Sequence, residues 1–256
     1  MIGMKPSITP EASIVLENGA EISAFHRRHR LALVVNGSDQ LDVVSYADFS
    51  APQVQQSLHL HGTANSVDVT ADGLIAVATA RAGSHRGWIE WFQIQADGSI
   101  ERAGRIRAGN LPDSLAFSPD GSKLVVADEG EPNSFYGTDD GRDPKGSISL
   151  VHVNRSAPSS SEVTSLGFGS YTHRQLNDLG LRLSGPDGTR VARDIEPEFV
   201  SISRDGRTAH VTLQENNGIA TIDLETAGIS ALFSAGIQDY SKAGRVDTSD
   251  ADDAYR

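Results

Sequence analysis

One short phrase occurs three times in the chain, and this internal repeat limits the fold more than any other feature of the sequence. Residues 66–73 are SVDVTADG, residues 113–121 are DSLAFSPDG and residues 198–206 are EFVSISRDG, and a second apolar run follows each copy. Each copy alternates apolar and polar residues, turns at an Asp-Gly pair and continues into another strand, which is the pattern of a β-hairpin. Such a hairpin cannot bury its own apolar face, so neighbouring copies must stack on one another.

The spacing of the copies predicts an all-β fold, a β-propeller built of four-stranded antiparallel blades. The first two copies begin about 47 residues apart, which is close to the period of WD40 or YVTN-like blades. The second and third copies begin about 85 residues apart, and we interpret this distance as one period plus an insertion. Residues 154–195 contain no further Asp-Gly hairpin with flanking strands. A diverged unit before the first copy brings the number of predicted blades to about four.

The chain divides accordingly into blades and connecting segments. The predicted parts are a lead-in at 1–18, blades at about 19–60, 61–109, 110–153 and 196–235, an insertion at 154–195 and a polar tail at 236–256. Four blades are few for a closed ring, and the aspartate-rich tail contains no strand that would close one. We therefore expect a fragment of a longer propeller of about seven blades. The alternative is a self-sufficient domain with an acidic tail.

The composition narrows the classes of function. The 256 residues include 34 acidic and 22 basic side chains, for a formal net charge of -12, and no cysteine. This charge argues against nucleic-acid binding, which depends on basic side chains that meet phosphates, but it is compatible with cations as partners. No apolar run reaches the roughly 18 residues of a transmembrane helix. The N-terminus shows no secretory signal.

Acidic side chains are concentrated where the propeller topology brings segments to one face. The segment that enters the first strand of a blade and the connection between its second and third strands lie on the same face. The expected metal ligands are Asp113, Glu129, Glu131, Glu196, Glu198 and Glu215, with Asn133, Asp139, Asp143, Asp194, Asn216 and Asn217 supporting them. Convergent carboxylates repel unless a cation lies among them, and calcium takes oxygen ligands in flexible numbers. Alternatively, these acids cap strand ends and pair with Arg193, Arg204 or Lys145.

Several segments resemble a known family. Residues 110–133 (NLPDSLAFSPDGSKLVVADEGEPN), 143–149 (DPKGSIS), 191–199 (VARDIEPEF) and 211–217 (VTLQENN) are similar to signature segments of choice-of-anchor I domain proteins. These are bacterial surface or secreted propellers, also described as alkaline-phosphatase-like, phytase-like or mesenchyme-specific cell-surface-glycoprotein-like. The resemblance covers most of the chain and implies an extracellular, periplasmic or cell-surface location.

Three residues depart from the family pattern. Asp128 stands in place of the usual asparagine, Lys145 in place of an acid, and Tyr240 where the family often has histidine. If that histidine mattered for chemistry, this chain has lost it.

Two classes of function follow from these observations. The first is a calcium-assisted binding or display module for a cell-surface ligand, in which the acidic channel mouth organises loops and no bond is broken. The alternative, implied by the resemblance, is a calcium-dependent phosphoric monoester hydrolase, with Arg193 as a contact for the phosphate ester. The sequence has no Gly-rich phosphate loop, no Gly-x-Ser-x-Gly elbow and no His-Glu-x-x-His motif, so catalytic residues cannot be assigned.

The histidines are not expected to bind metal. The alternately spaced His59 and His61 have no acid in the same segment, so we expect both at a solvent-facing loop edge. His26 and His29 belong to a basic hairpin turn that we expect to be solvated.

Overall fold

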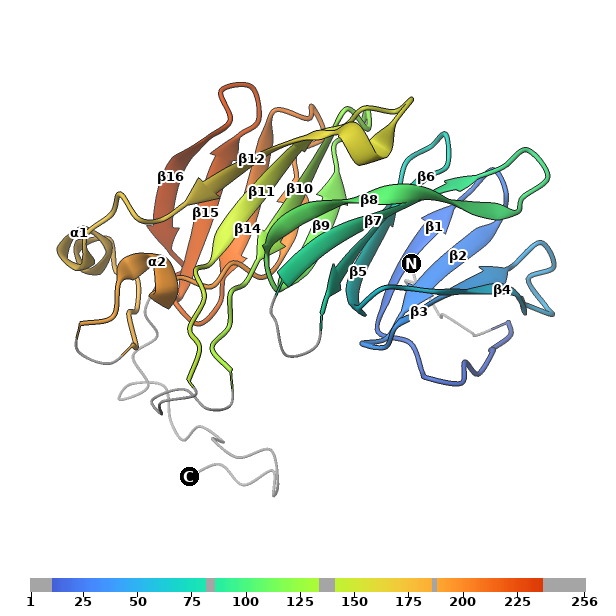
Figure 1. The fold of residues 1–256 in the computed structure, drawn as a ribbon, viewed down its shortest axis with the longest axis horizontal. Coiled ribbons are helices and arrows are strands. Elements are labelled where there is room, and N and C mark those ends of the chain that lie inside the picture. Colours follow the sequence, from blue (N-terminus) through green and yellow to red (C-terminus); the bar gives the residue numbers. More distant parts are fainter. Residues whose placement is uncertain (1–10, 82–85, 134–140, 186–187, 237–256) are drawn as a thin grey trace, which may run out of the picture.

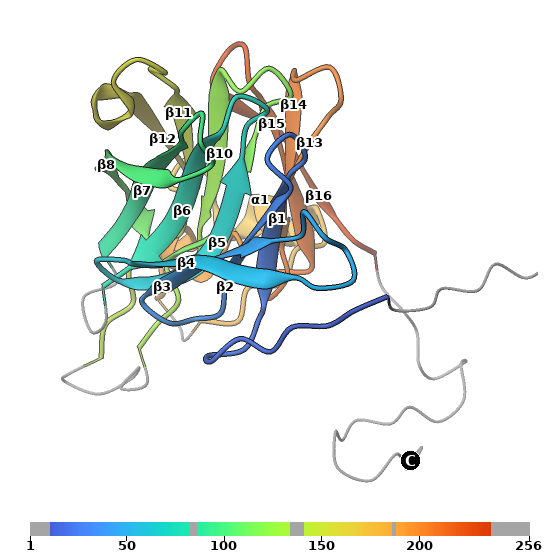
Figure 2. The ribbon, with the colours of Figure 1, turned by 90° about the vertical axis from the view of Figure 1, so that its right-hand side faces the viewer.

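The computed structural model describes residues 11–81, 86–133, 141–185 and 188–236. The described chain forms four separate four-stranded sheets, and each sheet is antiparallel, with its strands in chain order. Figure 1 shows the sheets following one another as blades, from blade 1 in blue to blade 4 in red. Figure 2 is seen from the side of blade 1. The prediction of an all-β, propeller-like architecture with about four blades is confirmed.

The four blades contain sixteen strands. Blades 1 and 2 consist of β1 (Ile22–His26), β2 (Leu31–Val35), β3 (Gln40–Ser45), β4 (Gln53–His59), β5 (Thr63–Val69), β6 (Leu74–Ala80), β7 (Arg86–Ile94) and β8 (Ile100–Asn110). Blades 3 and 4 consist of β9 (Pro112–Phe117), β10 (Lys123–Asp128), β11 (Ser147–His152), β12 (Glu162–Gly167), β13 (Val200–Ile202), β14 (Thr208–Leu213), β15 (Gly218–Asp223) and β16 (Gly228–Ser234).

The first strand of every blade lies next to the first strand of its neighbour. β1 packs beside β5, β5 beside β9, and β9 beside β13. Two serines at the same position of successive repeats link these strands. Ser66 Oγ accepts a hydrogen bond from the Leu115 N–H at 3.2 Å, and Ser114 Oγ accepts one from the Val200 N–H at 3.2 Å. The repeat thus sets both the hairpins and the contacts between them.

The core consists of apolar layers between successive blades. β6 is buried along its whole length because it is covered on both sides. Its residues Ile75 and Val77 face blade 1, whereas Leu74, Ala76 and Ala78 pack with blade 3. Alternating side chains of one strand therefore fill two different layers, as the period of two in a β-strand requires.

The Asp-Gly turns form as predicted. Gly73, Gly121 and Gly206 have φ values of 90°, 64° and 70°, in the left-handed region that favours glycine. In each turn a Ser or Thr hydroxyl two residues before the aspartate donates a hydrogen bond to the carboxylate. The three turns lie on one face of the molecule, which we call the hairpin face.

The outermost strands correct the predicted division of the chain. β12 lies inside the segment 154–195, which was predicted to be an insertion, and it is the fourth strand of blade 3. Blade 3 therefore extends beyond residue 153. β4 lies within the bounds predicted for blade 1 and is the fourth strand of that blade. Both strands are mostly exposed and lack the apolar alternation of inner strands, because one edge of each faces solvent.

The remaining part of the insertion connects blades 3 and 4. It contains the helices α1 (His173–Asp178) and α2 (Val191–Asp194), whose buried residues Leu176 and Val191 join the apolar layer between these two blades. α1 starts at a capping box formed by Thr172 and Gln175. None of the helices among the described residues is long and apolar enough to cross a lipid bilayer.

Candidate functional site: the acidic channel mouth

The first strands of the four blades surround a cavity of about 430 Å³, the channel. Its lining includes Glu21, Asn65, Ser66, Asp68, Asp113, Ser114, Phe199 and Val200. Polar side chains from blades 1, 2 and 3 thus meet in one opening, as the propeller topology predicted.

The six predicted ligands come from segments that enter or leave these inner strands. We call Asp113, Glu129, Glu131, Glu196, Glu198 and Glu215 the acidic mouth. Backbone hydrogen bonds hold their segments in place. The Glu129 N–H donates to the carbonyl of Leu111 at 2.9 Å, and the Glu198 N–H donates to the carbonyl of Thr212 at 3.0 Å. The connection after β10 is therefore tied to the start of β9, and the start of blade 4 is tied to β14.

The acids of the mouth act on one another electrostatically. Burial raises the pKa of Glu129 to about 8, and the charges of Asp113, Glu131, Glu196 and Glu215 add to the rise. Like charges in a partly desolvated site disfavour the ionised form, which explains the direction of the change. The six carboxylates thus behave as one cluster, although four separate segments supply them.

Three other members show the same effect. Burial raises the pKa of Glu196 to about 7, with Glu215 as the strongest neighbouring charge. Burial, a hydrogen bond with Glu215 and the charge of that residue raise the pKa of Glu198 to about 8. The pKa of Asp113 is raised by burial, and then by Glu21, Glu131 and Glu215.

Unsatisfied oxygen atoms accompany this cluster. Glu198 Oε1 and Asp143 Oδ1 are buried and have no hydrogen-bond partner among the described residues. A buried acceptor without a partner loses its solvation without compensation. Both atoms would be stabilised by a cation or by a proton.

The side chains do not form a finished metal cage. Within the described ranges, no three histidine or carboxylate side chains converge closely enough to hold an ion. The donor set nevertheless suits a hard divalent cation, because every member supplies oxygen.

The predicted supporting residues have mainly structural roles. Asn216 is fully buried; its Oδ1 accepts the Glu196 N–H at 3.1 Å, and its Nδ2 donates to the Asp194 carbonyl at 2.6 Å. The Asp194 carboxylate accepts the N–H groups of Ser184 and Gly185, so it closes a loop. Of these residues, only Asn216 positions a member of the mouth.

The other supporting residues lie in loops around the mouth. Asn217 bonds to Ser234 and to the carbonyl of Gly236, which ties the end of β16 to the connection between β14 and β15. Asn133 accepts a hydrogen bond from the Arg142 N–H and thereby closes the loop after Glu131. Asp139 lies outside the described residues.

Two further residues bear on the predicted chemistry. The guanidinium of Arg193 donates to the backbone carbonyl of Asp143, so in this arrangement it holds a loop. A small cavity of about 100 Å³ beside it is lined by Thr189, Asp194 and Glu196, among others. Burial raises the pKa of Asp143; Arg193 opposes this rise and Asp194 adds to it. A phosphate contact through Arg193 stays a prediction.

Asp128, the residue that departs from the family pattern, is fully buried directly before Glu129. Its carboxylate accepts hydrogen bonds from the Gly109 N–H and from the hydroxyls of Ser147 and Ser149. Burial raises its pKa to about 7, although these hydrogen bonds oppose the rise. Asp128 thus fixes the strand from which Glu129 extends.

Glu21 belongs to this site and was missed. It lies directly before β1, and its charge contributes to the raised pKa of Asp113 in blade 3. Asn65, Asp113 and Glu198 take the comparable place at the start of β5, β9 and β13. An alignment of the diverged first repeat with the other three repeats would have identified Glu21.

The histidines differ from expectation in two places. His26 is buried, and its ring bonds to the carbonyl of Ala71, so it is not solvated. His61 bonds through its N–H and its Nδ1 to the fully buried Glu90, which also pairs with Arg102. This cluster holds the connection between blades 1 and 2 against β7, and the acid that His61 meets lies far away in the sequence.

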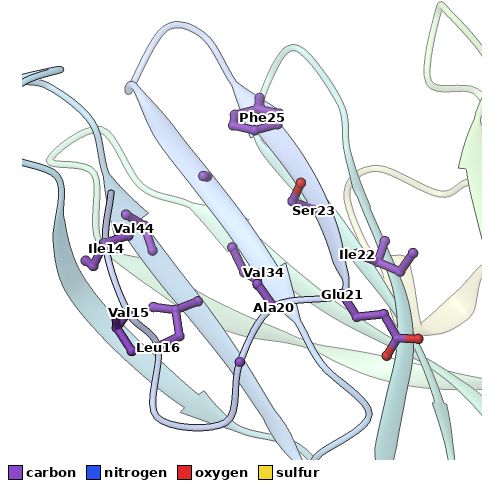
Figure 3. A pocket seen from close by; sticks show the side chains of 12 residues that line it. Ile14, Val15, Leu16, Ala20, Glu21, Ile22, Ser23, Phe25, Val34 and Val44 are labelled. Carbon is purple, nitrogen blue, oxygen red and sulfur yellow. The ribbon is translucent and has the colours of Figure 1, made fainter. Parts of the chain in front are cut away.

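A second hollow, of about 440 Å³, lies on the outer side of blade 1 and is mainly apolar. Ile14, Leu16, Val34 and Val44 are among the apolar side chains that line it (Figure 3). The Glu21 side chain extends away from these residues in Figure 3, and Glu21 lines both this hollow and the channel.

Solved structures support the fold. A protein from Lactobacillus plantarum has a TM-score of 0.59 at 16% identity, and the match covers 84% of this chain and 57% of that one. A functionally unknown protein from Desulfotomaculum acetoxidans has a TM-score of 0.55 at 16% identity, covering 86% and 57%. The periplasmic gluconolactonase PpgL of Pseudomonas aeruginosa has a TM-score of 0.54 at 15% identity, covering 86% and 59%. This chain thus spans less than two thirds of each structure, and at these identities the likeness shows the fold alone.

The sequence comparisons are more specific. Residues 21–256 match the family model of the choice-of-anchor I domain, which is nearly the whole chain. No curated protein matches the sequence.

Proposed function

Because the chain belongs to the choice-of-anchor I domain family of bacterial surface β-propeller modules, we propose that it is a binding or display module whose acidic mouth takes up a divalent cation, calcium. The ion orders the loops of the mouth, and no bond is broken. The family supports a location at the cell surface or outside the cell.

One observation carries this proposal: burial, and after it the charges of neighbouring acids, raise the pKa of Glu129 and Glu198 to about 8 and that of Glu196 to about 7. The folded chain therefore holds carboxylates together at an electrostatic cost. A divalent cation would remove this cost, because it favours the ionised form of every carboxylate around it.

Calcium is favoured over other ions by the donors and by their arrangement. Carboxylates and amide oxygens are hard ligands, and calcium accepts six to eight of them in flexible geometry, whereas magnesium demands a near-ideal octahedron. The mouth combines acids from several loops without a preformed cage, which suits an ion that tolerates irregular coordination.

The hydrolase alternative has less support. Phosphoester hydrolysis needs positive groups that hold the phosphate oxygens in the transition state. Arg193, the arginine predicted for this role, donates to a backbone carbonyl beside the mouth. The gluconolactonase resemblance concerns the fold alone, so it adds no argument for catalysis.

Calorimetric titration tests the cation. We expect calcium to bind the chain at pH 8 and to bind Glu129→Gln/Glu198→Gln about tenfold or more weakly, since two charged ligands are lost. A matched control is Glu162→Gln/Glu225→Gln, which removes the same charge from exposed residues on the hairpin face.

The two variants separate a site from general attraction. If the heat of calcium binding falls equally in the mouth variant and in the control variant, the ion responds only to net charge and the proposed site is wrong. If wild type shows no binding heat in the presence of calcium, and calcium does not raise its Tm, the proposal is wrong altogether.

A further inference from the structure

The outer strand of blade 2 bears a group of side chains of the opposite charge to the mouth. Trp88 in β7 lies against two arginines of the neighbouring β8. The guanidinium carbon of Arg105 is 4.4 Å from the centre of the Trp88 ring system, and that of Arg107 is 4.0 Å away. Trp88 is half-buried and both arginines are exposed. Cation–π contacts of this length restrict where the guanidinium groups point.

Neither arginine is neutralised in the part of the chain that the structure describes. Arg102 on the same strand pairs with Glu90, and Arg155 pairs with Asp72. Arg105 and Arg107 form no ion pair with a described residue. The outermost strand of blade 2 thus carries two positive charges that no described acid neutralises, in a chain whose net charge is -12.

The register of the strands places these groups on one side of the sheet. Arg107 lies opposite Trp88 and Arg105 opposite Glu90, whereas Glu101 lies opposite Gln93. Trp88 and Glu90 share a side of β7, and Gln93 faces the other side. Glu90 is fully buried and bonded to Arg102 and His61, so its charge is already matched. The exposed part of this side is therefore basic.

We propose that Trp88, Arg105 and Arg107 form a docking surface for a carboxylated polysaccharide. A planar guanidinium binds a carboxylate through two parallel hydrogen bonds, and a guanidinium already stacked on an aromatic ring loses less freedom when it does so. The exposed part of Trp88 adds apolar contact for a sugar ring. The proposal uses only the surface location from the proposed function, and it is independent of calcium.

The charge of the rest of the molecule selects against other anionic polymers. A nucleic acid presents a dense row of phosphates, and the excess of acidic residues would repel it beyond the short basic strip. A polysaccharide with one carboxylate per sugar carries fewer charges per length than double-stranded DNA, which has about one per 1.7 Å of its axis, so the acidic excess repels it less. The surface is short, so we expect modest affinity that weakens with added salt.

A different role for these arginines must be distinguished. Charged side chains on an edge strand prevent it from pairing with another chain. That role needs charge alone, so lysine would serve equally well. Docking of carboxylates through stacked guanidinium groups needs the planar fork, which lysine lacks.

The test is binding of polygalacturonate to the 256-residue chain in calcium-free buffer with chelator, measured by thermophoresis at low salt. We expect Arg105→Gln/Arg107→Gln to weaken binding about tenfold or more, and Arg105→Lys/Arg107→Lys to weaken it about threefold or more. Arg27→Gln/Arg28→Gln removes the same charge from an exposed hairpin and should change binding by less than about twofold. The fully methyl-esterified polymer should not bind.

Five results would overturn the proposal, and the first four concern binding strength. These four are the absence of binding by wild type, equal binding by Arg105→Gln/Arg107→Gln, equal losses in the two glutamine variants, and binding of polyglutamate or DNA as tight as that of polygalacturonate. Full affinity in the lysine variant would also overturn the proposal. It would indicate that the arginines only keep the edge strand from pairing and attract the polymer through charge alone. Chelator keeps the acidic mouth free of calcium, so failure here is distinct from failure of the cation site.

Discussion

The two faces of the propeller use aspartate and glutamate in opposite ways. On the hairpin face, hydrogen bonds from the Ser118 hydroxyl and from the backbone and hydroxyl of Ser122 lower the pKa of Asp120 to about 2. At the mouth, burial and neighbouring acids raise the pKa of Glu129 to about 8. Asp120 on the hairpin face is therefore stabilised in the charged form, and Glu129 at the mouth is stabilised in the neutral form.

The difference depends on where the partners come from. Asp205, like Asp120, takes hydrogen bonds from its own turn: the Ser203 hydroxyl first and then the Arg207 N–H lower its pKa. The mouth acids meet other acids from distant segments, for example Glu198 with Glu215. Asp120 and Asp205 are thus satisfied within their own turns, and the mouth acids need a partner that the described residues do not supply.

The difference between the two faces should have its largest effect on the pH dependence of stability. The folded chain holds protons at Glu129 and Glu198 up to about pH 8, whereas the unfolded chain releases them near the ordinary pKa of 4.5. Between these values folding takes up protons, so the free energy of unfolding should fall as pH rises. We expect the Tm in chelator to be several degrees lower at pH 8.5 than at pH 5.5.

Asp120 on the hairpin face affects the stability of the fold over a different, lower pH range. The pKa of Asp120 is about 2 in the fold and 3.8 otherwise, so its contribution is complete above pH 3.8 and is lost as the pH falls towards 2. A Tm that stays level from pH 5.5 to 8.5 in chelator would show that the mouth acids do not repel one another. The contrast between the acids of the two faces would then be wrong.

The repeated hairpins could be predicted because their determinants are local. An Asp-Gly pair between alternating runs fixes the turn, and the preceding Ser or Thr completes it with one hydrogen bond, as at Ser118 and Asp120. The edge strands β4 and β12 were missed because polar side chains cover most of their surface. A strand that is held mainly by backbone pairing leaves little periodicity in the sequence.

The face of the mouth could be predicted from topology, but the role of each residue could not. Glu129 and Glu198 were assigned to this face because the ends of successive strands alternate between the two faces. Asn217 was assigned to the mouth by the same topology, and its amide bonds to Ser234 and Gly236. Which atoms an amide meets depends on packing between segments, and spacing along the chain does not encode it.

The Trp88 group was missed for a related reason. Counted from the turn between β7 and β8, the pairing shifts register once before Trp88, between Trp91 and Phe92, and this shift places Arg107 opposite Trp88. A bulge moves every later residue by one position, so the cross-strand partner cannot be inferred from an ideal hairpin.

The next test removes the repulsion at the mouth. Glu129→Gln/Glu198→Gln should raise the Tm at pH 8.5 in chelator and flatten the pH profile. Both residues are partly exposed, so solvent screening limits the gain to on the order of 1 kcal/mol, or about 2–4 °C. Glu162→Gln/Glu225→Gln is the control and should leave the profile unchanged. A lower Tm in the mouth variant would mean that its acids are held by attractive partners.

The smallest expected effect comes from the hairpin face and has the opposite sign. Asp120→Ala removes the acceptor for the Ser118 and Ser122 hydroxyls and for the Ser122 N–H. The turn is exposed, so water replaces part of these bonds, and we expect a loss of about 1 kcal/mol at pH 7. Thermal unfolding would detect a fall of about 2–4 °C in Tm. At pH 2 the difference from wild type should shrink, because the carboxyl is then about half protonated. An equal difference at both pH values would assign the loss to turn geometry and leave the charge of Asp120 without a role.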